Sequence, residues 1–330
     1  MIEQIGNTDL IYNKYLSELY NCTISIKAEY QNPGMSSKDR PAISMIRDAE
    51  KRGLLKTGDT IVEASSGNTA LGLGMIAKEL GYHTHFFLSK GSSIEKRQAL
   101  LLHGASVTIC ENSTSPNDSE STMACAKDWC LSNPDSFFCN QYYNKANSLA
   151  HFEGTGPEIW KQSKGSVTHF VCGVGTGGTI SGVGKFLKKK NPMITVIGVD
   201  SEGSILYDFF YYGQVSEVTS SVCPIEGIGR KFLPSVLDFG CIDEFFRVSD
   251  KQAVNQIYDF IEHDAHLPGF SSGAVLSALN QMSAGLRPND HVVLLFADHG
   301  SRYMSKIYNQ EWLIEHKHNQ WIIQQTAQTG

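Results

Sequence analysis

The sequence predicts an α/β fold in which mostly parallel strands alternate with helices. Short runs rich in β-branched and aromatic residues recur along the chain, and such runs are typical of buried strands. These runs are TIVEA (60–64), THFFLS (84–89), SVTIC (106–110), THFVCGV (168–174), ITVIGVD (194–200) and HVVLLFAD (291–298). Segments of helical periodicity separate them. In ALGLGMIAKEL, for example, Leu73, Ile76, Ala77 and Leu80 fall on one face of a helix. Regular alternation of this kind indicates parallel sheets flanked by helices.

Length and composition narrow the class of protein. The chain has 330 residues, which is enough for two domains of roughly 100–200 residues each. Hydrophobic residues make up 41% and charged residues 19% of the chain, a globular composition. The net charge is −6 and there is no long basic run, which argues against a nucleic-acid partner.

Signals for membrane insertion, secretion and metal binding are not found in the sequence. No apolar run approaches the roughly 18 residues that a membrane span needs. The N-terminus MIEQIGNTDL lacks the basic and apolar regions of a signal peptide. The eight cysteines form no CxxC pair, and the eleven histidines form no HExxH motif. We therefore expect reduced thiols, a cytoplasmic location, no membrane association and no metal site.

The first informative motif is NPGMSSKDR (32–40), which joins the strand-like run TISIKAEY to the helical run PAISMIRDAEKRGLL. Pro33 and Gly34 predict a turn, and Lys38 falls where the helix begins. A partly desolvated lysine at the positive end of a helix has a lowered pKa. Its neutral amine is a nucleophile that forms a Schiff base with an aldehyde. Read alone, a single lysine is more often a solvated side chain, so this interpretation depends on the other motifs.

The second motif, VEASSGNTALG (62–72), leads from a strand into a helix through Ser65, Ser66, Gly67, Asn68 and Thr69. Such a turn offers free backbone N–H groups beside the positive end of the helix, which together bind a carboxylate or a phosphate. An ordinary helix N-cap explains the same residues equally well, because Ser and Asn are favoured there.

The third motif, GVGTGGTISG (173–182), also follows a strand and precedes a helix. Its glycines allow the backbone to approach an anion closely, and Thr176 and Thr179 add hydroxyl donors. The motif also contains the pattern GxGxxG, and Asp200 ends the next strand. That combination is the dinucleotide fingerprint, so an NAD-dependent dehydrogenase is an alternative of another class.

The three motifs combined supply what pyridoxal phosphate (PLP) chemistry requires. The cofactor needs a lysine for its aldehyde and a glycine loop for its phosphate. A separate turn must hold the substrate carboxylate, so that one Cα bond is aligned for cleavage. Nicotinamide chemistry has no use for such a lysine. The combination therefore favours a PLP-dependent enzyme over a dehydrogenase.

Six stretches, in order along the chain, resemble the cysteine synthase and cystathionine β-synthase family of fold type II PLP-dependent enzymes. They are NPGMSSKDRPAISMI, SSGNTALGL, NQYYNKANSLAHFEGTGPEIW, VTHFVCGVGTGGTISG, EGIGRKFLPSVLD and SRYMSKIYNQEWL. The resemblance runs from about residue 5 to about residue 315. Residues 198–237 and 303–313 look more like cystathionine β-synthase, without its haem-binding and regulatory segments. Residues 270–278 look more like cysteine synthase.

The resemblance implies roles for the matching residues. Lys38 matches the lysine that bonds the cofactor aldehyde and carries the proton transfers. The other implied cofactor contacts are Asn68 at the 3′-hydroxyl and the phosphate loop of Gly175, Thr176, Gly177, Gly178 and Thr179. The implied substrate contacts are Ser65, Ser66, Gly67, Thr69 and Gln141 at the carboxylate, and Gly227, Ile228, Gly229 and Arg230 at the entrance.

Several positions depart from the family pattern. Met35 stands where a second glycine is usual, Ala64 and Ser65 stand for the common Pro-Thr, and Ala70 replaces a glycine. Ser65 keeps the hydroxyl group of the usual threonine. A serine at this position is, however, conformationally freer than a threonine.

Two further positions bear on specificity and mechanism. Arg230 stands where cystathionine enzymes carry a tyrosine. It would favour an acidic group, such as a phosphorylated serine or a second carboxylate, or else it is a solvated loop residue. The residue facing the pyridine nitrogen, usually a serine or threonine, falls on Asp298 or His299, and we predict Asp298. An ionised aspartate there would keep the nitrogen protonated and strengthen the cofactor as an electron sink.

The resemblance implies a two-lobed fold like that of the tryptophan synthase β chain. The larger, cofactor-binding lobe would comprise residues 1–42 and 154–330. Residues 43–153 would form a smaller, mobile lobe with the carboxylate turn. The implied reaction is β-replacement, in which a β-substituent leaves an amino acid and a thiol adds at Cβ. We predict L-serine and homocysteine as substrates, with cysteine synthesis from O-acetyl- or O-phosphoserine and sulfide as the alternative. Family likeness also suggests a homodimer.

Overall fold

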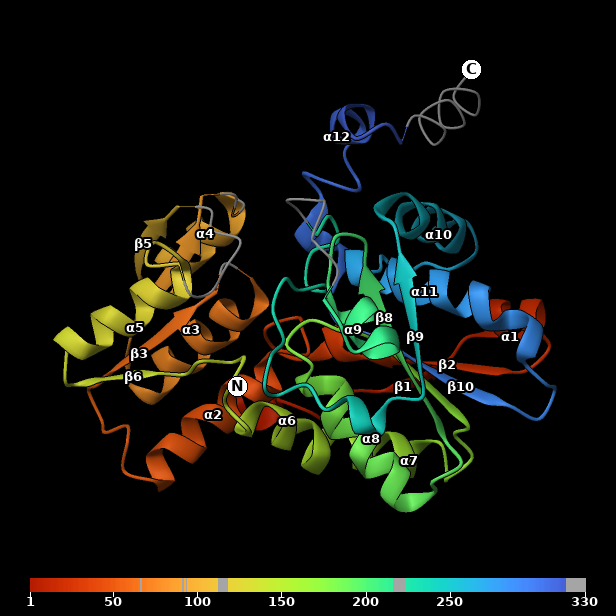
Figure 1. Cartoon of the computed structure of the whole chain (residues 1–330), viewed down its shortest axis with the longest axis horizontal. Coiled ribbons are helices and arrows are strands. Elements are labelled where there is room, and N and C mark those ends of the chain that lie inside the picture. The colour runs from red at the N-terminus through yellow and green to blue at the C-terminus, as the bar shows by residue number, and fades with distance from the viewer. Residues whose placement is uncertain (66, 91, 93, 112–117, 216–222, 319–330) are drawn as a thin grey trace.

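The computed structural model describes residues 1–330 apart from 66, 91, 93, 112–117, 216–222 and 319–330. The strands form two sheets, one of six strands and one of four. The two sheets lie side by side, each between layers of helices (Figure 1). The polar segment ENSTSPNDSESTM (111–123) lies partly outside the described residues, and the C-terminal QQTAQTG (324–330) lies wholly outside them.

The elements follow the predicted alternation. The strands are β1 (Leu10–Tyr12), β2 (Thr23–Ala28), β3 (Thr60–Ala64), β4 (His83–Ser89), β5 (Ser106–Cys110), β6 (Ser136–Phe138), β7 (His169–Gly173), β8 (Thr195–Ser201), β9 (Glu244–Val248) and β10 (His291–Phe296). The helices are α1 (Lys14–Tyr20), α2 (Asp39–Lys51), α3 (Asn68–Leu80), α4 (Ile94–Leu102), α5 (Thr122–Ser132), α6 (Ala146–Ala150), α7 (Gly156–Gln162), α8 (Gly178–Lys190), α9 (Leu206–Tyr212), α10 (Asp250–His263), α11 (Phe270–Met282) and α12 (Gln310–Glu315). Every predicted strand run forms a strand, so the α/β prediction is confirmed.

The six-stranded sheet has the order β1-β2-β10-β7-β8-β9, and only the β1–β2 pair is antiparallel. Its central strand β10 is buried on both faces. Val292 and Leu294 pack in one core with α10 and α11, whereas Val293 and Leu295 pack in another core with α8. This double burial explains why the strand is a continuous apolar run and not an alternating one.

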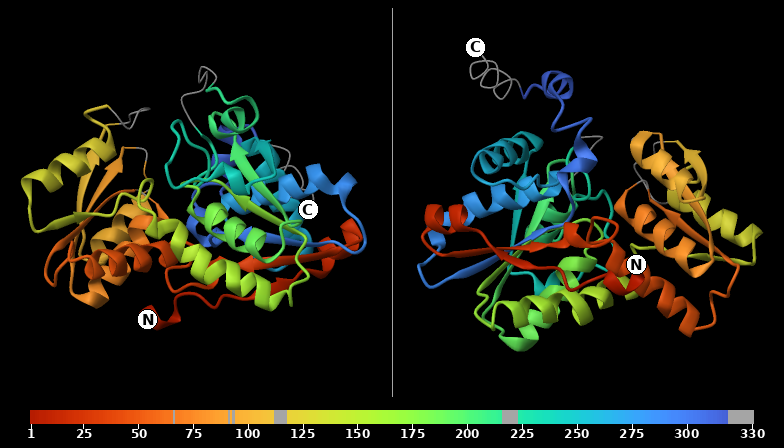
Figure 2. Two further views of the ribbon diagram at one scale, coloured as in Figure 1. Left: turned by 60° about the horizontal axis from the view of Figure 1, so that its bottom comes forward. Right: turned by 180° about the vertical axis from the view of Figure 1, so that it is seen from behind.

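The four-stranded sheet has the order β5-β4-β3-β6 and is parallel throughout. Ile61 and Phe86 pack with α2 and α3 on one face, and Val62 and Phe87 pack with α5 on the other. The views in Figure 2 show this sheet and its helices standing beside the larger sheet from two further directions.

The strands divide between the sheets as the two-lobed prediction requires. Strands β3 to β6 lie within residues 43–153, and the other strands lie outside that range. The lobe boundaries and the mobility of the smaller lobe stay predictions. Among the described residues, none of the helices combines the length and apolar character that a membrane crossing requires.

Candidate active site

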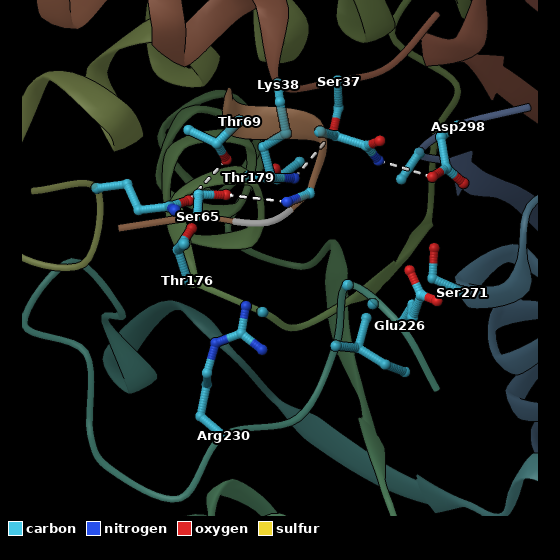
Figure 3. A pocket seen from close by; sticks show the side chains of 18 of the residues that line it. Ser37, Lys38, Ser65, Thr69, Thr176, Thr179, Glu226, Arg230, Ser271 and Asp298 are labelled. Carbon is cyan, nitrogen blue, oxygen red and sulfur yellow. Dashed lines mark hydrogen bonds between the residues drawn. The ribbon is translucent and has the colours of Figure 1, made fainter. Parts of the chain in front are cut away.

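A pocket of about 370 Å³ lies between the two sheets, at the carboxyl ends of β3, β7 and β10. Ligands of parallel sheets commonly bind at this end. The predicted site residues that line it are Lys38, Ser65, Gly67, Asn68, Thr69, Gln141, Gly175, Thr176, Gly177, Thr179, Gly227, Ile228, Arg230 and Asp298. Gly178 and Gly229 do not line it, and Ser66 lies outside the described residues. Lys38, Thr69 and Arg230 approach the same space from different sides (Figure 3).

The backbone around Lys38 is held by the end of the neighbouring strand β10. The N–H of Ser37 donates to the carbonyl of Ala297 over 2.8 Å, and Ser36 pairs with Asp298 in an isolated β-bridge. β10 itself ends at Phe296, two residues before the end of the predicted run, and the next two residues contact the Lys38 segment instead. Lys38 then occupies the N-cap position of α2, as the sequence predicts.

The side chain of Lys38 enters the pocket, where its Nζ donates to the Ser37 hydroxyl over 3.2 Å. Burial lowers the pKa of Lys38. Cys172 and Asp298 act in the opposite direction, and Arg230 adds to the lowering. A lysine with a lowered pKa is more readily present as the neutral, nucleophilic amine.

The glycine loop after β7 has the geometry that anion-binding loops need. Gly177 has a φ of +84°, in the left-handed region that favours glycine. A Cβ on Gly175 would lie 2.2 Å from the carbonyl oxygen of Gly227, so a side chain is excluded there. In the part of the chain that the structure describes, the backbone N–H groups of residues 175–177 have no hydrogen-bond partner. Free N–H groups at the start of a helix, here α8, favour a phosphate.

A buried histidine holds Thr179 of this loop. His151, which begins the π-helical turn His151–Thr155, contacts Thr179 Oγ1 through Nε2 at 3.2 Å and Thr155 Oγ1 through Nδ1 at 2.9 Å. Burial lowers the pKa of His151 to about 3, so the imidazole is neutral at neutral pH. A neutral imidazole has one donor and one acceptor nitrogen, which suits two hydroxyl partners. The sequence gives no signal for this contact.

The predicted carboxylate turn is fixed by buried polar contacts. Thr69 Oγ1 donates to Gln141 Oε1 over 2.7 Å. Glu63 accepts from the backbone N–H groups of Gln141 at 3.1 Å and Ala64 at 2.8 Å. Burial raises the pKa of Glu63 to about 7, although these backbone hydrogen bonds act against burial. The Gln141 amide and the Ser65 hydroxyl line the pocket beside this turn, where they can donate to a carboxylate.

Asp298 is buried at the end of β10, where its Oδ2 accepts from Asn68 Nδ2 at 2.7 Å and from the Tyr303 hydroxyl at 2.8 Å. The other side-chain oxygens, Oδ1 of Asn68 and Oδ1 of Asp298, are buried without a partner among the described residues. His299, the alternative from the sequence, does not line the pocket. Ser271, at the start of α11, does line it and was not predicted, because a serine at a helix start looks like a capping residue.

Three charged residues that were not predicted also line the pocket. Glu226 forms ion pairs with both Lys96 and Lys306. Lys96 belongs to α4, beside the four-stranded sheet, whereas Glu226 and Lys306 belong to the side of the six-stranded sheet. This ion bridge therefore joins the two sides of the pocket. The sequence gives no signal for it, because the three residues come from distant segments of the chain.

The residues present fit PLP and do not fit a dinucleotide. A lysine with a lowered pKa, a glycine loop with free N–H groups and the unpartnered Oδ1 of Asn68 suit the aldehyde, phosphate and hydroxyl of PLP. Asp200, the acidic residue of the dinucleotide fingerprint, is buried and accepts from the N–H groups of Ser201 at 3.0 Å and Tyr207 at 2.9 Å. The fold and the pocket thus define a PLP-dependent enzyme of fold type II.

Comparisons with known proteins agree with this class. The model of the family "Pyridoxal-phosphate dependent enzyme" matches residues 1–298. The chain is 37% identical over 324 residues to a cysteine synthase of Dictyostelium discoideum, covering 96% of this chain and 85% of that protein. It is also 37% identical over 315 residues to a cystathionine beta-synthase of Apis mellifera, covering 95% of this chain but only 62% of that protein. The solved structure of an O-ureido-L-serine synthase matches with a TM-score of 0.82 and 28% identity, covering 92% of this chain and 93% of that one.

The chain belongs to the pyridoxal-phosphate dependent enzyme family, among the cysteine synthases and cystathionine β-synthases. It is a PLP-dependent enzyme of the β-replacement type. The predictions of the family, the fold class and the cofactor are confirmed, and the dehydrogenase alternative is rejected.

Proposed function

We propose that this enzyme joins L-serine to L-homocysteine to give L-cystathionine. The alternative is the synthesis of cysteine from O-acetyl- or O-phospho-L-serine and sulfide. Relatives of both names match nearly the whole chain at 37% identity, so they support β-replacement without separating the two reactions. The first choice is supported by the resemblance of residues 198–237 and 303–313 to cystathionine β-synthase. One observation supports an amino-acid substrate most directly: Lys38 and the Thr69–Gln141 pair line the same pocket.

Lys38 is the proposed covalent anchor for the cofactor and, once released, the base that removes the Cα proton of the substrate and later returns it. When bound, PLP supplies the electron sink that lets the Cα proton and then the β-substituent leave. One amine can act as base and acid only if both protonation states are accessible, and a lowered pKa favours this. With serine as donor, the protonated Lys38 is also the proposed source of the proton that the departing hydroxyl needs.

The other residues are proposed to bind and orient. Gly175, Thr176, Gly177, Gly178 and Thr179 would hold the cofactor phosphate, and Asn68 its 3′-hydroxyl. Ser65, Ser66, Gly67, Thr69 and Gln141 would hold the substrate carboxylate, and Gly227, Ile228 and Gly229 would line the entrance. Asp298 stays our proposal for the pyridine nitrogen. Ser271 is a second candidate, because it lines the same pocket and Oδ2 of Asp298 already accepts two hydrogen bonds.

The proposed catalytic cycle includes closure of the smaller lobe. Residues 43–153 contain the carboxylate turn, so a bound carboxylate would draw this lobe toward Lys38 and exclude water from the reacting atoms. A homodimer and a cytoplasmic location are proposed from family likeness alone.

Product analysis tests the proposed reaction. L-Serine, O-acetyl-L-serine and O-phospho-L-serine are each combined with sulfide and with L-homocysteine, and products are identified by mass. Cystathionine formed from serine and homocysteine with the highest kcat/KM supports the first choice. Cysteine formed fastest from an activated serine and sulfide supports the alternative. Failure of the PLP-loaded enzyme to form any β-replacement product would contradict both, and Lys38→Ala serves as the inactive control.

A further inference from the structure

Among the described residues that line the pocket, cationic side chains outnumber carboxylates. The lysine and arginine side chains are those of Lys38, Lys96, Arg230 and Lys306, and the carboxylates are those of Glu226 and Asp298. An excess of positive charge in a concave site attracts anionic ligands. A pocket cation can bind a ligand anion most readily when neither of the two carboxylates already neutralises it.

Both carboxylates have partners other than Arg230. Glu226 pairs with Lys96 and Lys306, and its pKa is lowered because these two lysines outweigh the effect of burial. Asp298 accepts from Asn68 and Tyr303. Within the described residues, no carboxylate lies within 4.0 Å of the Arg230 guanidinium. Among the described residues, Arg230 and Lys38 are therefore the pocket cations without a carboxylate partner. Lys38 is the proposed anchor of the cofactor, so Arg230 is the cation that remains for a substrate anion.

The guanidinium of Arg230 is oriented by weak contacts that leave part of it unused. Its Nη1 donates to the carbonyl of Gly229, and its Cζ lies 5.3 Å from the centre of the Tyr142 ring. Its Nη2 lies 3.2 Å from the position of a Cβ on Gly175, so the group stands beside the glycine loop. Its Nε is buried without a partner among the described residues. Figure 3 shows the guanidinium pointing from its own loop into the pocket.

We propose that Arg230 forms a second anion subsite, which binds an anionic oxygen group of a substrate other than the α-carboxylate held at the Thr69–Gln141 turn. The proposal rests on the β-replacement reaction described above. Leaving a partly buried guanidinium unpaired is unfavourable, and its planar array of donors matches a carboxylate or a phosphate. The free N–H groups of the glycine loop remain for the cofactor phosphate, so Arg230 is not needed for that group.

Two substrates could supply this anionic group. One is a phosphorylated serine, whose Cβ–O bond breaks with its electron pair passing to the phosphate oxygen, so that inorganic phosphate leaves. The other is an amino-acid acceptor such as homocysteine. Its sulfur forms the new bond to Cβ and its thiol proton is released, while its carboxylate remains on the guanidinium. In both cases the guanidinium binds an anionic oxygen group. An experiment that varies the donor and the acceptor separately shows which of the two substrates carries that group.

The donor arm measures binding to the PLP-loaded enzyme by calorimetry, for O-phospho-L-serine and for O-acetyl-L-serine, which has no anionic leaving group. The acceptor arm measures kcat/KM with O-acetyl-L-serine as donor, for L-homocysteine and for 3-mercaptopropylamine, its analogue without the carboxylate. The variants are Arg230→Gln, Arg230→Lys and Lys161→Gln. The last removes an exposed cation of α7 outside the pocket and serves as the matched control.

If the subsite exists, Arg230→Gln should lower the phosphoserine affinity of the donor arm or the homocysteine kcat/KM of the acceptor arm at least tenfold, about 1.4 kcal/mol. Arg230→Lys should lower the same quantity by less. The neutral ligand of that arm and the Lys161→Gln control should change less than about twofold. A loss in the donor arm identifies the phosphate as the bound group, and a loss in the acceptor arm identifies the carboxylate. Three outcomes for Arg230→Gln would each overturn the proposal. They are an equal loss of affinity or kcat/KM for the anionic and the neutral ligand, no loss in either arm, and weaker retention of PLP.

The same measurements separate this proposal from the proposed function. Suppose that Arg230→Gln selectively loses phosphoserine binding while neither the wild type nor any variant shows turnover. That result would support the subsite and reject the proposed reaction. Normal turnover in the wild type with unchanged selectivity in Arg230→Gln would keep the reaction and reject the subsite.

Discussion

The side-chain amide of Asn68 donates a hydrogen bond to the carboxylate of Asp298 over 2.7 Å, and this bond joins the start of α3 to the segment that follows β10. The Tyr303 hydroxyl donates to the same carboxylate oxygen over 2.8 Å. Asp298 is buried, so these two donors compensate for the water that its Oδ2 has lost.

Removing one of these donors should destabilise the protein and impair the site. Tyr303→Phe leaves the buried Asp298 carboxylate with one donor, and we expect the free energy of unfolding to fall by about 1–3 kcal/mol with a lower kcat/KM. Tyr308→Phe is the control, because its hydroxyl donates to the carbonyl of Pro268 outside the pocket. Urea denaturation and steady-state kinetics measure both effects. Equal activity in the two variants would mean that the bond to Asp298 does not organise the site.

Gln141→Ala should weaken binding of the amino-acid donor and leave the cofactor attached. The variant removes the amide that pairs with Thr69 at the carboxylate turn, while the glycine loop stays intact. We expect KM for the donor to rise about tenfold, equivalent to ~1.4 kcal/mol. Gln281→Ala, an exposed change on α11, is the control. Loss of PLP from Gln141→Ala would show that Gln141 is structural and not a substrate contact.

Glu63 should make the stability of the protein depend on pH. Burial raises its pKa from 4.5 to about 7 in the folded state. The folded protein keeps a proton that the unfolded chain releases, so this contribution is fully present below pH 4.5 and is lost as the pH rises to about 7. The loss is on the order of 3 kcal/mol at most. Urea denaturation at stepped pH should show a flatter profile for Glu63→Gln than for the wild type. The exposed change Glu153→Gln should keep the wild-type slope, and an unchanged slope in Glu63→Gln would contradict the assignment.

The contact between His151 and Thr179 should support cofactor binding. His151→Phe removes the imidazole nitrogen at 3.2 Å from Thr179 Oγ1, so this hydroxyl is no longer oriented in the glycine loop. We expect PLP to bind about five- to tenfold more weakly, as expected for loss of one hydrogen bond. Equilibrium dialysis of the cofactor measures the effect. Thr155→Val, which leaves the Thr179 contact in place, should retain more PLP than His151→Phe. Equal retention of PLP in the two variants would show that His151 does not position Thr179 for cofactor binding.

Local patterns allowed most of the fold and the main binding motifs to be predicted from the sequence. Strand β10 is apolar on both faces because it is buried on both faces, and Lys38 and the glycine loop lie in short contiguous motifs. Contacts set by topology could not be predicted. The order β2-β10-β7 brings strand ends together that are far apart in the sequence, and only this order places Asp298 beside the Lys38 segment.

The sequence also could not predict the backbone conformation at a position that departs from the family pattern. The sequence identifies Met35 as a substitution for a usual glycine. It does not reveal that the backbone keeps a glycine-like conformation, with a φ of +56° at Met35. Likewise, the ion bridge from Lys96 through Glu226 to Lys306 depends on side chains from both sides of the pocket, and no spacing along the chain encodes it.

The covalent position of the cofactor tests the assignment of the site most directly. The PLP-loaded enzyme is reduced with borohydride and digested, and the pyridoxyl group is located by mass spectrometry. Reduction should bleach the visible absorption, and the pyridoxyl mass should lie on the peptide that contains Lys38. In Lys38→Ala no pyridoxyl peptide should form. A pyridoxyl group on another lysine of the pocket, such as Lys96 or Lys306, would contradict the role assigned to Lys38.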